Sequence, residues 1–259
     1  PLSGAAYRSY LVHLFHFRQP RVYLNSAPMF PGRLVPRTRM QLAILALIAA
    51  TLICCVMLLG RRTIYGEWKL LFLLWNLVLA WIPLIFAIPI YALRARRVHR
   101  PWLLAFCAAI WFFFYPNAPY LITDLVHLKT RPPVPRWYDL ITLMSFAWTG
   151  VLLGNLSLYL LQEVIRAWRG RAASWCFAIA MLALGALGVF VGRFWRWNSW
   201  QPFLKPLDLA SDALSRLRGM GATELGLFSG TFFAFSLLTY ITVYTLTHLH
   251  GYVDVKPGG

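Results

Sequence analysis

The stretch "WLLAFCAAIWFFFYPNAPYLITDLVHL", residues 102–128, begins as an apolar membrane helix and becomes polar in its second half. Four polar side chains follow one another there at spacings of three, four and three: Asn117, Tyr120, Asp124 and His127. A helix places residues at these spacings in one stripe. Pro116 and Pro119 each remove a backbone donor, which predicts a kink or a short unwound segment. Because lipid offers polar groups no partner, we expect the stripe to face protein or water.

The rest of the chain has the composition of a membrane protein. Of its 259 residues, 59% are hydrophobic and only 13% are charged. The apolar residues form runs of about 20, long enough to cross a hydrocarbon core. The sequence therefore predicts an all-α fold, a polytopic transmembrane helix bundle of about six spanning helices. We expect these helices at residues 41–60, 69–93, 101–127, 138–162, 172–193 and 225–249.

The chain divides into a basic N-terminal tail (1–40), a transmembrane domain (41–249) and a C-terminal tail (250–259). Two interpretations of residues 1–28 stay open, an interfacial segment or an extended gene model. Within the long fifth connection, "KPLDLASDALSRLRG" (205–219) has acids early, arginines late and leucines on one face. This pattern predicts one interfacial amphipathic helix on the membrane surface.

The net charge of +17 comes from Lys and Arg in short connections between apolar runs. Such residues set topology and meet anionic lipid headgroups, so we expect anionic membrane lipids as partners and no nucleic acid. The larger share lies in the N-terminal tail and in the connections 94–100 and 166–171. Both termini are therefore predicted to be cytoplasmic. The four cysteines lie inside apolar runs without metal-ligand spacing, so neither a metal nor another cofactor is expected.

Other helices bring polar groups to the same membrane depth as the stripe. They are Asn76 on the second helix, Asp139 at the start of the fourth, and Arg193, Arg196 and Asn198 at the end of the fifth. We expect the two arginines to face Asp124 and Asp139. His127 is the nearby side chain of a type that titrates near neutral pH. A salt-bridge cluster that fixes helix ends would use the same residues, but ionisable groups inside a membrane tend to mark a site.

Small and hydroxylic residues indicate where helices pack. Gly188 and Gly192 form a Gly-xxx-Gly pair, with Gly185 one turn earlier, which is typical of close helix contact. On the last helix, we interpret Ser236, Thr239, Tyr240 and Thr247 as interhelical hydrogen-bonding groups.

Three functional classes remain open, and whether the protein is an enzyme is one of the open points. The first is a site that binds or processes an anionic lipid-linked or envelope substrate, with Asp124 and His127 as candidate acid and base groups. Its candidate substrate-binding residues are Asn76, Asn117, Tyr120, Asp139, Arg193, Arg196 and Asn198. The second is a transporter or channel in which Asp124 and His127 relay protons or ions. The third is a structural or assembly subunit, with a membrane-protein partner or a second copy of the chain.

Four blocks carry a family resemblance: "WNLVLAWIP" (75–83), "FYPNAPYLITDLVHL" (114–128), "WYDLITLMSFAWTG" (137–150) and "GRFWRWNSW" (192–200). In this order they resemble the uncharacterised bacterial membrane family known as domain of unknown function 1361, from about residue 42 to 249. The resemblance implies a multi-helix protein of the bacterial inner membrane and no particular activity. In that family the position after the last Trp is often acidic, whereas here it is Gln201.

Overall fold

The computed structural model describes residues 37–96, 100–129, 133–196 and 222–248, together with Ser211 and Ser215. These residues form helices and, within the described ranges, no β-strand. The elements are α2 (Arg37–Tyr65), α3 (Phe72–Ala95), α4 (Pro101–Phe114), α5 (Asn117–Tyr120), the 3₁₀ helix η1 (Leu121–His127), α6 (Arg136–Phe190), the π-helix η2 (Val191–Trp195) and α9 (Ala222–His248).

Five of the helical stretches are long and apolar enough to cross a membrane. They are Arg39–Tyr65, Phe72–Ala95, Pro101–His127, Arg136–Trp195 and Thr223–His248. The fourth stretch, of 60 residues, consists of two helices joined at Gly170, which accounts for the six helices that the sequence predicts. Many large apolar side chains on these helices are exposed, for example Val56, Trp75 and Leu238, as expected of surfaces that meet lipid.

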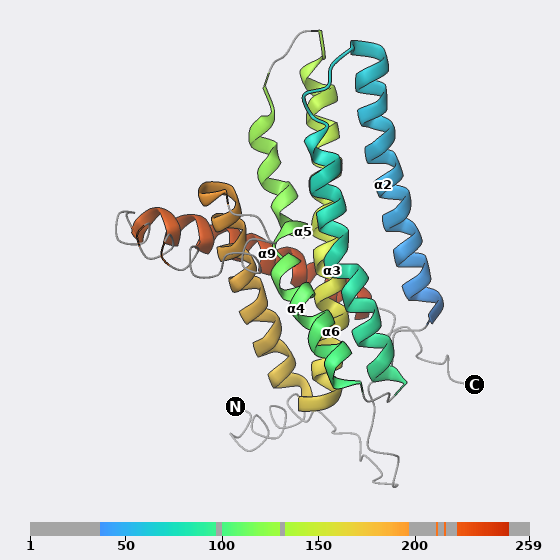
Figure 1. The fold of residues 1–259 in the computed structure, drawn as a ribbon, viewed down its shortest axis with the longest axis vertical. Helices are drawn as coiled ribbons and strands as arrows, with labels where there is room; N and C mark the ends of the chain where they lie inside the picture. Colours follow the sequence, from blue (N-terminus) through green and yellow to red (C-terminus); the bar gives the residue numbers. More distant parts are fainter. Residues whose placement is uncertain are drawn as a thin grey trace, which may run out of the picture. The chain divides into compact units, whose positions relative to one another are not determined.

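The helix α6 is the central element, because it packs against α2, α3, α5, η1, η2 and α9. It has two arms, which we call the first arm (136–169) and the second arm (171–190). Gly170 joins them with φ 86° and ψ −179°, a conformation that favours glycine. In Figure 1 the two arms are seen to run in opposite directions from this turn. The sequence predicted the two helices, and Gly170 is the residue that separates them.

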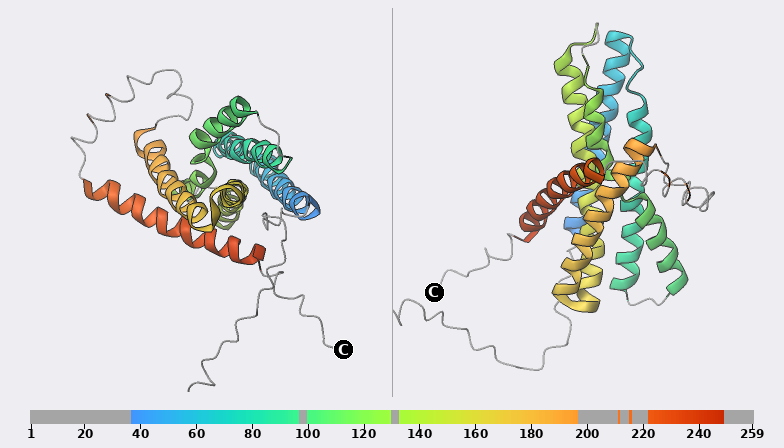
Figure 2. Two further views of the ribbon diagram at one scale, coloured as in Figure 1. Left: turned by 90° about the horizontal axis from the view of Figure 1, so that it is seen from below. Right: turned by 90° about the vertical axis from the view of Figure 1, so that its left-hand side faces the viewer.

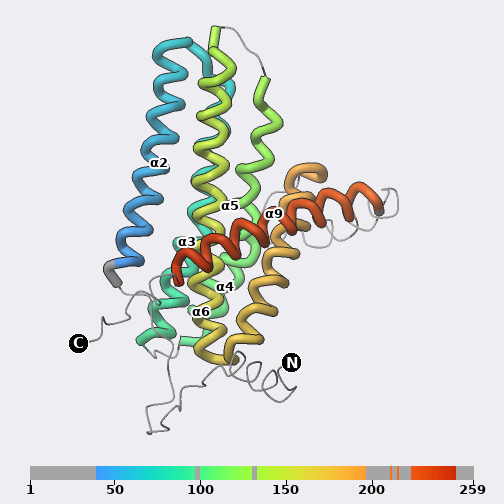
Figure 3. The backbone as a smooth tube through the Cα atoms, turned by 180° about the vertical axis from the view of Figure 1, so that it is seen from behind, coloured from blue at the N-terminus to red at the C-terminus, as the bar shows by residue number. Residues whose placement is uncertain are grey.

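The helix α9 packs on α6. Figure 2 shows it on the side of α6 away from α3 and α4, and Figure 3 shows it crossing the arms of α6. The buried Tyr240 of α9 donates a hydrogen bond to Oε1 of the buried Gln162 on the first arm. This contact confirms the interhelical role predicted for Tyr240. Gln162 was not singled out in the sequence.

The proline segment between α4 and η1 does bend the third membrane helix. The chain keeps helical dihedral angles at Pro116 (φ −62°, ψ −22°), but the regular α-helix stops at Phe114 and tightens to a 3₁₀ helix after Tyr120. The α-helix is therefore interrupted at the prolines, but the short unwound segment, one of the two predicted alternatives, is not found, because the dihedral angles stay helical.

Glycines on both arms of α6 allow this bent segment to pack closely. A Cβ atom added to Gly188 would lie 2.5 Å from Cγ of Pro116, and one added to Gly185 would lie 2.8 Å from Cε1 of Tyr115. On the first arm, an added Cβ at Gly150 would clash with the carbonyl oxygen of Ala118. The close packing predicted for Gly185 and Gly188 is confirmed, and it positions the polar end of the segment.

Some predictions concern residues outside the described ranges. These are the N-terminal tail up to residue 36, Asn198, Gln201, the interfacial helix at 205–219 apart from Ser211 and Ser215, and the C-terminal tail. The two serines are helical.

Candidate functional site

Asp124 is the centre of a polar cluster where α3, η1 and η2 meet. Its side chain is buried, and its Oδ2 accepts a hydrogen bond of 2.8 Å from Nδ2 of Asn76. Its Oδ1 lies 3.4 Å from a guanidinium nitrogen of Arg193, an ion pair between η1 and η2. The convergence of these three residues, predicted from their depth along separate helices, is confirmed.

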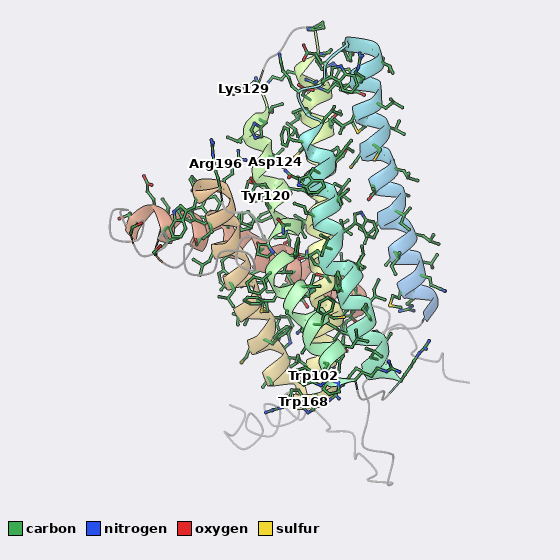
Figure 4. All side chains as sticks on the ribbon, viewed as in Figure 1. Trp102, Tyr120, Asp124, Lys129, Trp168 and Arg196 are labelled. Carbon is green, nitrogen blue, oxygen red and sulfur yellow. The ribbon has the colours of Figure 1, made fainter. Side chains whose placement is uncertain are left out.

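Arg193 also contacts the other members of the polar stripe. Its guanidinium nitrogens lie 3.5 Å from the hydroxyl of Tyr120 and 3.5 Å from Nε2 of His127. The ring of His127 packs edge-on against Phe72, with 5.0 Å between centroids. In Figure 4, Tyr120, Asp124 and Arg196 lie at a similar height in the middle part of the helices, whereas Trp102 and Trp168 lie at the lower end. One arginine thus connects three residues of the stripe.

This cluster borders a groove of about 660 Å³, which we call the α3–α6 groove. Residues of α4 and α5 line it together with residues of α3 on one side and of the second arm and η2 on the other. Its polar lining consists of Asn76, Asn117, Tyr120, His127, Arg193 and Arg196. Its large apolar and aromatic lining includes Trp75, Leu79, Phe112, Phe113, Met181 and Leu184. The groove therefore combines an anion-attracting part and an apolar part.

The backbone at the arginine end of the groove is irregular. η2 is a π-helix, a rare form that often occurs at functional sites. The next residue, Arg196, has a φ of 58° and is the only non-glycine residue with positive φ among those the structure describes. Such a left-handed conformation at a bulky residue costs roughly 1–3 kcal/mol. Arg196 lines the groove together with Arg193.

The two arginines differ in their partners. Arg193 shares its charge with Asp124, whereas Arg196 is exposed and forms no ion pair with any carboxylate in the described part of the chain. Arg193, Arg196 and Asp124 together contribute one net positive charge at the groove. This charge would attract an anion.

The sequence of the chain was compared with known protein families, curated proteins and solved structures. A family model described as "Protein of unknown function (DUF1361)" matches residues 75–246. The chain belongs to this family. The resemblance seen in the sequence blocks is thus confirmed, although the DUF1361 match begins at Trp75, later than the predicted residue 42. No curated protein and no solved structure matches the chain.

All residues that line the α3–α6 groove lie within the DUF1361 region, from Trp75 to Arg196. The helix α2 precedes that region. The DUF1361 match therefore includes both parts of the groove lining.

Asp139 does not join the cluster, which corrects the expectation that it faces Arg193 and Arg196. Its Oδ1 lies 2.8 Å from Nε of Arg61 on α2, and its Oδ2 accepts a second bond of 3.3 Å from the same guanidinium. Arg61 also donates a bond of 3.1 Å to the backbone oxygen of Glu67, and both charged side chains are buried. The physical reason is that α2, rather than η2, supplies the cation beside the start of α6.

The spacing of residues on α2 could have indicated that Arg61 is buried. Leu47, Cys54 and Leu58 form the buried face of α2, and Arg61 continues their spacing of seven, four and three. Its neighbour Arg62 is not on that face and stacks on Trp68, at 4.1 Å from the ring centroid. Neither Arg61 nor Arg62 is among the candidate site residues of the sequence analysis.

The remaining candidates are placed as follows. Asn117 lines the groove and donates a bond of 3.1 Å to the backbone oxygen of Phe114. The apolar lining of the groove was not predicted, since its residues resemble lipid-facing ones. Within the described ranges, no three His, Cys, Asp or Glu side chains come close enough to hold a metal ion.

Proposed function

We propose that the α3–α6 groove binds an anionic amphiphile of the membrane, with its charged group at Arg193 and Arg196 and its hydrocarbon chain along the apolar lining. The observation that carries this proposal is that one cavity has both arginines and a large apolar wall. A site for a fully polar solute would not need the second feature.

The charged part suits phosphate or carboxylate. A guanidinium donates parallel hydrogen bonds to two oxygens of such a group. Arg196 is available for this, and Arg193 can share its donors between Asp124 and a ligand. Asn76, Asn117 and Tyr120 add polar side chains beside them. A phospholipid headgroup and the phosphate of a lipid-linked substrate present the same chemistry here.

The apolar part suits a hydrocarbon chain. Arg193 and Met181 lie on one nearly continuous helix, about 18 Å apart at 1.5 Å per residue. Met181 is buried at the apolar end, whereas Trp75 and Leu184 line the groove and are 58% and 45% exposed. Their exposure supports lateral entry from lipid. The volume of about 660 Å³ is that of a site for one small ligand or for a headgroup and part of a chain.

Within this proposal, Asp124 and His127 have different roles. Both oxygens of Asp124 are bonded and its side chain is buried, so Asp124 holds Arg193 in place and partly neutralises its charge. His127 is half-buried and lines the groove. A reaction at a bound headgroup would therefore use His127 as its proton donor or acceptor.

We also propose that the groove opens toward the outer surface of a bacterial inner membrane, with both termini cytoplasmic. The support comes from the distribution of charge. The helix ends opposite the groove's arginines carry, among the described residues, Arg37, Arg39, Arg94, Arg96, Arg100, Arg166, Arg169 and Arg171. The other helix ends carry Arg61, Arg62, Lys69, Lys129 and Arg136. Cytoplasmic ends of membrane helices carry such an excess of arginine and lysine.

The test is binding of dodecyl phosphate to the purified protein in a neutral maltoside detergent, followed by calorimetry. We expect saturable binding that Arg196→Gln weakens about tenfold, a change of about 1.4 kcal/mol in binding free energy. Arg62→Gln makes the same charge change on α2, away from the groove, and is the matched control. Equal losses in both variants would reduce the effect to general charge attraction and contradict the proposal.

A second measurement locates the chain. Dodecyl phosphate brominated near its end should quench tryptophan fluorescence, and part of this quenching should disappear in Trp75→Phe, because Trp75 lines the groove. Trp148→Phe removes a similarly exposed tryptophan that is not part of the groove lining. Loss of the same quenching in both variants would indicate that the amphiphile only joins the surrounding micelle. Sodium phosphate alone should bind far more weakly than dodecyl phosphate if the chain contributes.

A further inference from the structure

A small cavity lies where α5, both arms of α6 and α9 meet. It leaves about 10 Å³ that a water-sized sphere can occupy. Tyr115 and Gly185 border both this cavity and the groove. Its polar lining comes from Asn155 on the first arm and from Ser236 and Thr239 on α9. We propose that this cavity is a binding site for one ordered water molecule.

Asn155 supplies the main argument. Its side chain is 5% exposed, and its Nδ2 has no hydrogen-bond partner among the residues that the structure describes. A buried amide without a partner is rare, and its cost in a membrane interior is several kcal/mol because lipid offers no substitute. A water molecule in the cavity that Asn155 borders would accept this hydrogen bond.

The other walls give the water further partners. Ser236 lines the cavity and is only 7% exposed. The Thr239 hydroxyl donates a bond of 3.0 Å to the backbone oxygen of Ser236, so its lone pairs remain available to accept. A bound water molecule needs two to four polar partners and a cavity large enough to hold it, about 10–15 Å³ by this measure. This cavity meets both conditions, whereas an apolar void of the same size would stay empty.

The site joins α9 to α6. Gln162 lies two helical turns after Asn155 on the first arm and bonds Tyr240, one turn after Ser236 on α9. The direct bond and the water-mediated bond therefore lie along the same contact between the two helices. Water-mediated hydrogen bonds are nearly as favourable in enthalpy as direct ones. On this inference, a direct and a water-mediated hydrogen bond attach α9 to α6, in addition to the apolar packing of the α9 phenylalanines.

The experiment is a density map of the full-length protein at about 2 Å resolution, with thermal unfolding of three variants. Asn155→Leu removes the amide at similar volume, and Ser236→Ala removes the hydroxyl. Ser229→Ala is the matched control, since Ser229 lies two turns earlier on α9, is also buried, and does not line the cavity.

We expect a density peak within hydrogen-bonding distance of Asn155 Nδ2 and Ser236 Oγ, and its loss in Asn155→Leu. We also expect lower melting temperatures for Asn155→Leu and Ser236→Ala, and no decrease for Ser229→Ala. Absence of the peak at that resolution would overturn the inference. So would a higher melting temperature for Asn155→Leu, because removing an unpartnered amide from a dry cavity stabilises the fold. If a variant does not fold, the map of the unaltered protein still decides.

Discussion

Arg61 and Asp139 form a buried, two-bonded ion pair that joins α2 to the start of α6, with 2.8 Å between Nε and Oδ1. The exposures of the two side chains, 1% and 3%, leave each of them without water as a substitute partner. The pair therefore acts as a structural clasp, separate from the groove.

Asp139→Ala is expected to lower the free energy of unfolding by about 3–5 kcal/mol, because it leaves the Arg61 charge buried without a partner. Thermal unfolding in detergent measures this loss. The double variant Arg61→Met with Asp139→Leu should lose less than Asp139→Ala alone. Lys69→Ala breaks the ion pair of the exposed Lys69 with the half-buried Glu67 and should change stability by less than about 1 kcal/mol. A similar small loss for Asp139→Ala would show that the clasp is not needed.

Asp124→Asn should strengthen the binding of dodecyl phosphate. The change removes the negative charge 3.4 Å from Arg193, so the groove gains one unit of net positive charge. At an effective dielectric constant near 20, this corresponds to an affinity increase of about tenfold or more. Calorimetry measures it. Glu163→Gln makes the same charge change beside Arg166 and should have little effect. Weaker binding by Asp124→Asn would mean that Asp124 mainly orients Arg193 for the ligand.

Gly188→Ala should destabilise the protein by about 1–3 kcal/mol, as overpacking of a tight contact does. Its Cβ would lie 2.5 Å and 2.8 Å from two ring carbons of Pro116. Gly226→Ala is the control, because no atom lies within 4 Å of its added Cβ. Unfolding curves of the two variants give the comparison. An unchanged Gly188→Ala variant would contradict the close packing of the second arm on the proline segment.

Tyr240→Phe should reduce stability by about 1–3 kcal/mol, since it leaves the buried Oε1 of Gln162 without its donor. Thr242→Val removes a hydroxyl from the exposed side of the same helix, where it bonds only the Leu238 backbone oxygen. The stability of this control variant should be close to that of the unaltered protein. Equal stability of both variants would show that α9 is held by apolar contacts alone.

The number of helices and the meeting of Asn76, Asp124 and Arg193 could be predicted from the apolar runs, because a run shows where the chain crosses the membrane and how deep each of its residues lies. Apolar runs of membrane length fix how many times the chain crosses, and each polar residue's position along its run fixes its level. A reversal of the whole protein moves all of them together, so the prediction did not depend on orientation.

The partner of Asp139 could not be predicted in the same way. The sequence places Asp139, Arg61 and Arg193 toward the same side of the membrane, but it does not determine which helices are neighbours. The apolar part of the groove was missed for another reason. Leu79 and Met181 have the same chemistry whether they meet lipid, a neighbouring helix or a ligand, and only packing distinguishes these cases.

The turn at Gly170 lies at one end of the second arm, and Arg193 lies beyond the other end, so a small rotation at Gly170 moves Arg193 by a large distance. Arg193 follows Gly170 by about 35 Å of helix, so a rotation of about 5° at that residue would displace Arg193 by about 3 Å. The contacts of Gly185 and Gly188 with Tyr115 and Pro116 restrain the second arm part-way along its length. The width of the groove therefore depends both on the angle of the turn at Gly170 and on the close packing of Gly185 and Gly188 against Tyr115 and Pro116.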